Sequence, residues 1–97
     1  MHHLKGRMPT DDPSRYLTRL CHHFRKKIEV EYDECQGLAR FPWGDCRLTA
    51  RDGALDFECS SASAEQLGRV RFVIDEHVAM FSRRSPMAVQ WQAPRPG

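Results

Sequence analysis

The sequence of 97 residues lacks the short motifs that would assign it a reaction. It contains no GxSxG motif and no phosphate-binding P-loop. Its cysteines, at positions 21, 35, 46 and 59, include no CxxC or CxxH pair, the usual half of a zinc site. There is also no apolar run of about 18 residues, which a membrane-spanning helix needs. The opening MHHLKGRMPTDD lacks the apolar segment of a secretory signal.

The charge balance is also uninformative about a partner. A net charge of +2 is too small to indicate a polyanion. We therefore expect a cytoplasmic protein that binds neither nucleic acid nor a membrane. In a reducing compartment its four cysteines should be free thiols.

The periodicity of the chain predicts two helices. Asp12 and Pro13 suit a helix start, and an apolar stripe at Leu17, Leu20, Cys21 and Phe24 predicts a helix from Pro13 to about Lys27. A second helix is expected from near Ser63 to about Ser82, because Ser63 and Gln66 fit a capping box. Its buried stripe comprises Leu67, Val70, Ile74, Val78 and Phe81.

Between the helices the apolar period becomes two, as in strands with one buried face. Strands are expected in IEVEYD, LARF, CRLTA and ALDFECS, with turns at Gln36-Gly37 and Asp52-Gly53. MAVQW predicts a last strand, and LKGRM a short edge strand at the start. The outward charges alternate between acidic and basic strands, so we expect a solvated sheet face whose charges pair with one another.

The resulting order is (β)-α-β-β-β-β-α-β. It predicts an α+β two-layer sandwich, an antiparallel sheet with both helices on one face. We expect residues 1–97 to form a single domain, with residues 1–4 and 93–97 disordered.

The stretch LCHHFRKK suggests a metal site, but helix geometry argues against a local one. Successive helical residues are about 100° apart, so Cys21 and His23 cannot chelate one ion between them. Cys21 belongs to the core stripe, and His23 lies on its flank, where a structural role is expected.

Two alternatives use residues from separate elements. Cys21, Cys46, Cys59 and His77 would form a Cys3His site for Zn or Fe if the fold brought them together. A cysteine nucleophile, Cys21 or Cys46, would need His77 or His23 as its base and a pocket that admits substrate. No motif marks such a pocket.

The segment FPWGDC supplies the one candidate for partner binding. Pro42 and Gly44 predict a tight connection that leaves Trp43 at a tip with little to pack against. Such a tryptophan is either an interface anchor, including for a homodimer, or folds back onto the protein.

SRYLTRLCHHF, FPWGDC and VIDEHVAMF followed by VQW together resemble a small bacterial family known only as a domain of unknown function, number twenty-two eighteen. The resemblance covers about Pro9 to Trp91. The matching positions are Ser14, Arg15, Tyr16, Leu17, Cys21, His23, Phe41, Pro42, Gly44, Cys46 and His77.

The resemblance implies no activity, and only a context of iron or siderophore handling. We therefore expect a non-enzymatic binding or interaction domain without a cofactor. Its partner would be a protein or a small molecule. A Cys/His metal protein and a cysteine-dependent enzyme remain the alternatives.

Overall fold

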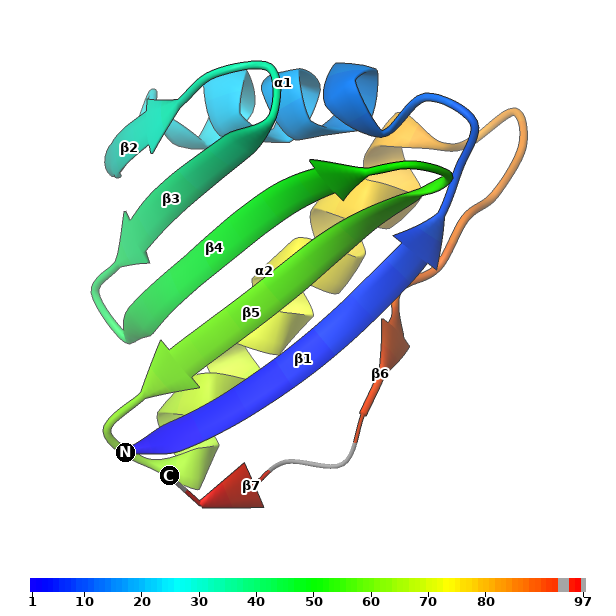
Figure 1. Cartoon of the computed structure of the whole chain (residues 1–97). Helices are drawn as coiled ribbons and strands as arrows, with labels where there is room; N and C mark the ends of the chain where they lie inside the picture. The colour runs from blue at the N-terminus through cyan, green and yellow to red at the C-terminus, as the bar shows by residue number, and fades with distance from the viewer. Residues whose placement is uncertain (93–94, 97) are drawn as a thin grey trace.

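A computed structural model describes residues 1–92 and 95–96, the last two as backbone only. The elements are β1 (His2–Pro9), α1 (Pro13–Phe24), β2 (Glu29–Tyr32), β3 (Gln36–Phe41), β4 (Gly44–Arg51), β5 (Ala54–Ser61), α2 (Ala64–Phe81), β6 (Gln90–Trp91) and β7 (Arg95–Pro96). The strands form one antiparallel sheet in the order β2-β3-β4-β5-β1-β6, and β7 also pairs with β1. Both helices lie on the same face of the sheet (Figure 1). The predicted α+β two-layer sandwich and its element order are confirmed.

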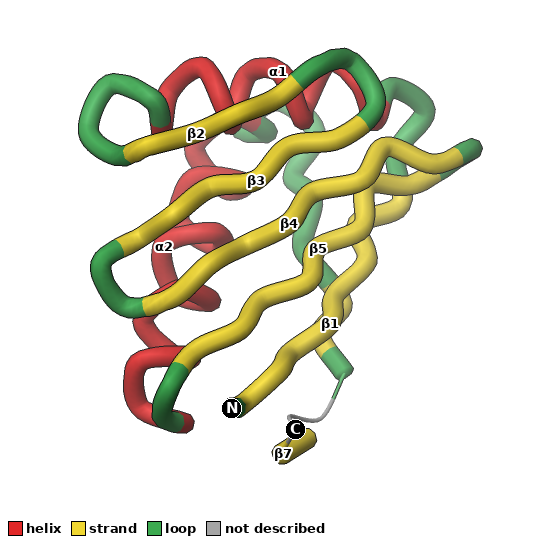
Figure 2. Tube along the Cα trace, turned by 60° about the vertical axis from the view of Figure 1, so that its left-hand side comes forward, coloured by secondary structure: helices red, strands yellow, loops and turns green. Residues whose placement is uncertain are grey.

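The core lies between the helices and the sheet. The largest fully buried side chains come from both layers: Phe57, Met8, Leu17, Leu20, Leu48, Leu55, Ile74, Val70, Val78, Cys21, Cys46 and Cys59. Helix α1 crosses the β2–β5 side, whereas α2 packs on β5, β4 and β1. Figure 2 shows the two helices stacked behind the strands, with the other sheet face open. Neither described helix combines the length and apolar character needed to cross a lipid bilayer.

Helix α1 ends earlier than expected, at Phe24 instead of about Lys27. Turn-like hydrogen bonds replace the last predicted turn, since the N–H groups of both Lys27 and Ile28 donate to the carbonyl oxygen of Phe24. Asp12 stands at the N-cap position, but its side chain makes no capping hydrogen bond. Helix α2 agrees more closely, because Ser63 accepts a hydrogen bond from the N–H of Gln66 at 3.1 Å, as a capping box requires.

Two predicted turns differ in position. The turn before β3 is at Asp33–Cys35 and not at Gln36-Gly37, because the Asp33 carboxylate accepts hydrogen bonds from the N–H groups of Cys35 (2.7 Å) and Gln36 (2.9 Å). The Asp52-Gly53 hairpin is as expected, with Gly53 at φ 80°. Gly44 lets β4 start directly after Trp43, since a Cβ there would collide with the carbonyl oxygen of Ser60.

The prediction of disorder at residues 1–4 is wrong for His2 to Leu4. The strand predicted at LKGRM is present as part of β1, but it is longer than expected and is not an edge strand. Strand β1 begins at His2 and lies inside the sheet, paired with β5 along its whole length from His2↔Ser61 to Pro9↔Ala54. Its hydrogen bonds and the burial of Leu4 and Met8 order the start of the chain. At the other end, the sequence predicts disorder for residues 93–97. Residues 93, 94 and 97 lie outside the described residues, whereas Arg95–Pro96 form β7.

The chain after α2 covers the open edge of the core. MAVQW forms only a two-residue strand, β6. The Trp91 indole reaches α2, where its Nε1–H donates to the Asp75 carboxylate at 2.8 Å. The indole ring packs over Gly6 and lies 5.9 Å from Phe57 between ring centroids. This indole closes the sandwich beside β1.

Candidate functional site

The three cysteines of the predicted alternative metal site all lie in the hydrophobic core. Cys46 and Cys59 are directly opposite in β4 and β5, and the Cys59 thiol donates a weak hydrogen bond to the Cys46 sulfur at 3.5 Å. Cys21 on α1 packs in the same core. All four cysteines of the chain are free, and only Cys35 is exposed.

His77 does not join these thiols. Its Nδ1 lies 2.7 Å from the carbonyl oxygen of Val73, and its ring packs against His23 and Phe24. Within the described residues, no group of three or more His, Cys, Asp or Glu side chains could hold a metal ion. The alternative Cys3His set is therefore not assembled, because His77 lies with Val73, His23 and Phe24 and not with the three thiols.

The thiols of Cys21 and Cys46 are kept protonated by their surroundings. Desolvation raises the pKa of Cys21 to about 12. The hydrogen bond with Cys59, followed by burial, raises the pKa of Cys46 as well. A thiol nucleophile needs the opposite, a lowered pKa and access to solvent. The geometry gives no support to catalysis by Cys21 or Cys46.

The two histidines of the family motifs instead meet at a separate hollow. His23 on α1 and His77 on α2 lie 4.7 Å apart between ring centroids, with Phe24 edge-on to His77 at 4.9 Å. Phe41, at the end of β3, lies edge-on to Phe24 at 5.3 Å. Together these elements enclose a cavity of about 220 Å³ that we call the histidine pocket, lined by His23, Phe24, Lys27, Ile28, Phe41, Val73 and His77.

The environment of the pocket favours the neutral form of the His23 imidazole. Burial lowers the pKa of His23, and the neighbouring His77, Lys26, Lys27 and His22 lower it further. If Nδ1 of His77 is the protonated nitrogen, it donates to Val73 and leaves Nε2 as an acceptor. The pocket thus combines apolar walls with two polar ring nitrogens and the Lys27 ammonium.

Trp43 packs against Phe41, which lines the histidine pocket. Its ring stacks on Phe41 with centroids 6.2 Å apart and an interplanar angle of 11°. It is half-buried, and its carbonyl oxygen accepts a hydrogen bond from Ser61. The expectation that Trp43 has little to pack against is therefore wrong, because the Pro42-Trp43 turn folds back onto β3. Its role in partner binding stays a prediction.

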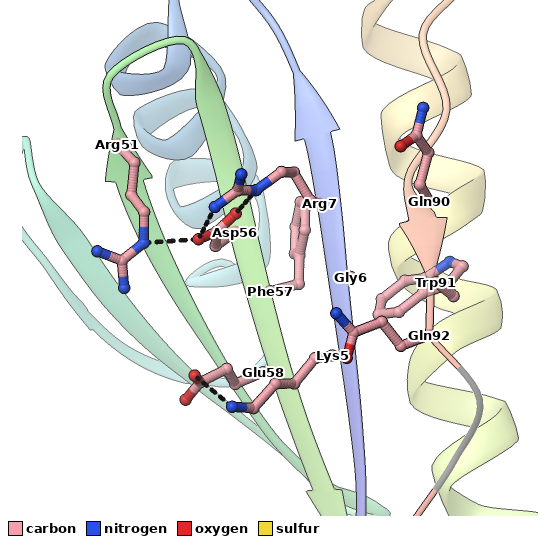
Figure 3. Close-up of a pocket in the computed structure, with 10 residues that line it drawn as sticks. All are labelled: Lys5, Gly6, Arg7, Arg51, Asp56, Phe57, Glu58, Gln90, Trp91 and Gln92. Carbon is pink, nitrogen blue, oxygen red and sulfur yellow. Dashed lines mark hydrogen bonds and ion pairs between the residues drawn. The ribbon is translucent and has the colours of Figure 1, made fainter.

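The uncovered sheet face holds a further hollow, of about 700 Å³, beside β5, β1 and β6. Figure 3 shows its ion pairs: the Asp56 carboxylate lies 2.9 Å from Arg7 and 2.6 Å from Arg51, and Lys5 lies 3.8 Å from Glu58. The two arginines hold the pKa of Asp56 below its usual value. The expected pairing of charges on this face is confirmed, and it leaves few charges to attract a ligand.

The remaining motif residues lie at the start of α1 and in the β3–β4 turn. Leu17 is fully buried in the core, Ser14 and Tyr16 are half-buried, and Arg15 is exposed. Pro42 is exposed in the β3–β4 turn. These positions do not reach the histidine pocket.

Sequence reasoning missed Lys27, Val73 and the aromatic wall of this pocket. The signal it did hold was the position of His23 and His77, each on the flank of an apolar stripe, where two helices packed on one sheet can touch. His23 was expected to have a structural role, and its contacts are with His77 and Phe81.

Comparison with known proteins supports the fold and the family. The chain is similar to the NMR structure of PA4090 from Pseudomonas aeruginosa, with 25% sequence identity over 95% of this chain and 96% of that one, and a TM-score of 0.79. No curated protein matches the chain. A family model matches residues 5–92, so the chain belongs to the family described as "Uncharacterized protein conserved in bacteria (DUF2218)".

Proposed function

We propose that this protein is a non-enzymatic binding domain whose histidine pocket takes a small aromatic acid. The observation that carries the proposal is the convergence of α1, α2 and β3 on one apolar cavity with two imidazoles and a lysine. Binding sites for small molecules have this composition, mostly apolar with a few placed polar groups.

The size of the cavity limits the ligand. A dry apolar cavity of roughly 150 Å³ is enough to hold benzene. At about 220 Å³, the histidine pocket suits a single ring with one or two substituents. The edges and faces of Phe24 and Phe41 offer that ring the tilted contacts that aromatic groups prefer.

The charge around the pocket favours an acid. The turn after α1 carries Arg25, Lys26 and Lys27, and none of them forms an ion pair with another described residue. Of the three, Lys27 lines the pocket. A carboxylate or phenolate on the ring would accept a charge-assisted hydrogen bond from its ammonium group.

The buried state of the thiols supports a role without covalent catalysis. Cys21, Cys46 and Cys59 are buried and form no disulfide, and none of them lines the histidine pocket. Free thiols are also usual in a reducing compartment, so a cytoplasmic location is part of this proposal.

The test uses benzoate as the probe, followed through backbone amide chemical shifts of the protein. Benzyl alcohol, an uncharged ring, and acetate, a charge without a ring, are the comparison probes. Benzoate should shift amides of α1, α2 and β3 around the pocket, with weaker binding of both comparison probes. Lys27→Gln should weaken benzoate binding about tenfold, the loss of one charge-assisted hydrogen bond.

Two variants make the result decisive. Lys26→Gln removes the neighbouring charge, which does not line the pocket, and should change the affinity little. Val73→Phe should fill the cavity and abolish binding while the thermal transition is retained. Equal effects of Lys26→Gln and Lys27→Gln, or unchanged binding in a folded Val73→Phe variant, would contradict the proposal.

A further inference from the structure

A second hollow lies between the helices, at the start of α1 and the end of α2. Its volume is about 310 Å³, and α1 contributes Arg15, Tyr16 and Arg19 to its lining. Phe81, Arg83 and Arg84 line it from the end of α2 and the residues that follow. We call this hollow the arginine cleft.

The cleft is strongly positive. Four guanidinium groups line it, and no lining residue is acidic. Within the described part of the chain, none of these four arginines forms an ion pair. On the sheet face, in contrast, Arg7 and Arg51 share the carboxylate of Asp56.

Helix stability explains the positions of Arg83 and Arg84, which follow the negative end of α2, but not the position of Arg15. Arg15 stands in the first turn of α1, at the positive end of the helix dipole, where a cation is unfavourable. That turn has no acidic residue and no side-chain cap. Asp11 and Asp12 precede the helix and are exposed, but neither lines the cleft. The unfavourable charge therefore points to a ligand that compensates it.

One guanidinium group of the arginine cleft is oriented by a contact within the protein. The guanidinium of Arg19 lies 4.8 Å from the centroid of the Phe81 ring, a cation–π contact that orients it. The half-buried Tyr16 and Phe81 give the cleft an aromatic wall between its charges. A bound molecule would meet both fixed positive charge and flat apolar surface.

We propose that the arginine cleft binds the phosphate groups of a small organic phosphate. Guanidinium groups match the oxygens of a phosphate with paired hydrogen bonds, and four of them suit one or two phosphate groups. A volume of about 310 Å³ is at the lower end of the range for small-molecule pockets. A single hollow and a net charge of only +2 favour a small molecule over a nucleic-acid strand, which tracks an extended positive surface.

The cleft is separate from the histidine pocket, although Phe81 lies between them. The Phe81 ring is 5.6 Å from His23 and 6.4 Å from His77. No residue lines both hollows. The inference therefore stands independently of the proposed function.

Pyrophosphate is the probe for the test, titrated into the full chain at constant ionic strength and followed by calorimetry and amide chemical shifts. Shifts should concentrate at the start of α1 and the end of α2. Arg15→Gln and Arg84→Gln should each weaken binding about tenfold or more, since each removes charge-assisted hydrogen bonds. Arg15→Lys should recover only part of that loss, because an ammonium cannot form the paired contact.

Arg69→Gln is the matched control, because it removes the same charge from an exposed position of α2 that does not line the cleft. It should weaken binding less than twofold. Equal losses in Arg69→Gln and Arg15→Gln would show a general charge effect and overturn the proposal. Tighter binding of a short oligonucleotide than of pyrophosphate, growing with its length, would also overturn it in favour of nucleic acid.

Discussion

The imidazole rings of His23 and His77 lie 4.7 Å apart, one from each helix. They are the closest aromatic link between α1 and α2, and Phe81 on α2 also contacts both rings. Two cations this close repel each other, so the neighbouring His77 helps to lower the pKa of His23. The contact couples the packing of the helices to the charge of the histidine pocket.

The first prediction concerns the pKa of His23. Burial is the main cause of its lowering and His77 the second, so His77→Phe should move the pKa of His23 part of the way back toward its usual value. His22→Ala is the control, because His22 is the weakest of the causes. Imidazole chemical shifts against pH measure both. An unchanged His23 pKa in the His77→Phe variant would contradict the coupling.

The sign of the pH effect on stability follows from the same pair. A histidine whose pKa is lower in the folded protein binds its proton more readily when unfolded. His23 should therefore stabilise the fold above its unfolded pKa, near 6.5, and this contribution should be lost as the pH falls through its folded pKa. His23→Phe should reduce that acid dependence, measured by urea unfolding between about pH 5 and pH 8.

The second prediction concerns Cys21 at alkaline pH. Its pKa is about 12 in the fold against 9.0 in the unfolded chain, so the unfolded thiol ionises first and stability falls as the pH rises between these values. The slope from this thiol should approach roughly 1.4 kcal/mol per pH unit. Unfolding free energies of Cys21→Ala should fall less steeply with pH than those of the wild type, whatever the cost of the lost sulfur at neutral pH.

Cys35→Ala is the matched control for this slope. Cys35 is exposed, so its removal should leave the alkaline dependence as in the wild type. Lysine and tyrosine side chains also titrate in this range, and the comparison of the two variants separates their effect. Equal slopes in Cys21→Ala and the wild type would refute the assignment.

The third prediction concerns bound metal. His77 packs against His23 and Phe24 and not against the thiols, so three cysteines and a histidine cannot share one ion. Protein purified without chelator should carry far less than one equivalent of Zn or Fe, measured by elemental analysis. A chelator should leave its thermal transition unchanged. The Cys3His alternative would be restored if the protein carried one equivalent of metal and if both Cys46→Ser and His77→Ala lost that metal completely.

Much of the fold could be predicted because its local patterns are strong. The alternation in ALDFECS and most of the apolar stripes of the helices agree with the buried residues observed. Val30 and Tyr32 in IEVEYD and Phe81 in α2 are only half-buried. The strand β1 was underestimated because its evidence is non-local. Leu4 and Met8 are two apolar residues around Gly6, and their partners in β5, Cys59 and Leu55, are far along the chain.

The candidate sites have the same limitation. The helical period predicts that His23 and His77 lie on the flanks of their apolar stripes. It does not predict the angle at which the helices cross, and this angle decides whether the two flanks meet. In the sequence, each of the arginines at positions 15, 19, 83 and 84 is typical of a solvated surface charge. Only the fold brings the start of α1 next to the end of α2. Convergence of separate elements is the information that a single sequence does not hold.

The last prediction tests the closure of the sheet edge by the indole of Trp91. A Cβ at Gly6 would lie 2.5 Å from Val89 Cγ1 and 2.6 Å from Trp91 Cε3, both closer than atoms can pack. Gly6→Ala should therefore push the chain after α2 away from β1 and lower the unfolding free energy by roughly 1–3 kcal/mol, as overpacking does.

Gly68→Ala supplies the contrast, since nothing lies within 4 Å of a Cβ at that position in the middle of α2. It should raise the unfolding free energy by about 0.5–1 kcal/mol through helix propensity. Urea unfolding measures both variants, and Trp91 fluorescence reports on its displacement in Gly6→Ala. A Gly6→Ala variant as stable as the wild type would mean that the segment holding Val89 and Trp91 does not close the core.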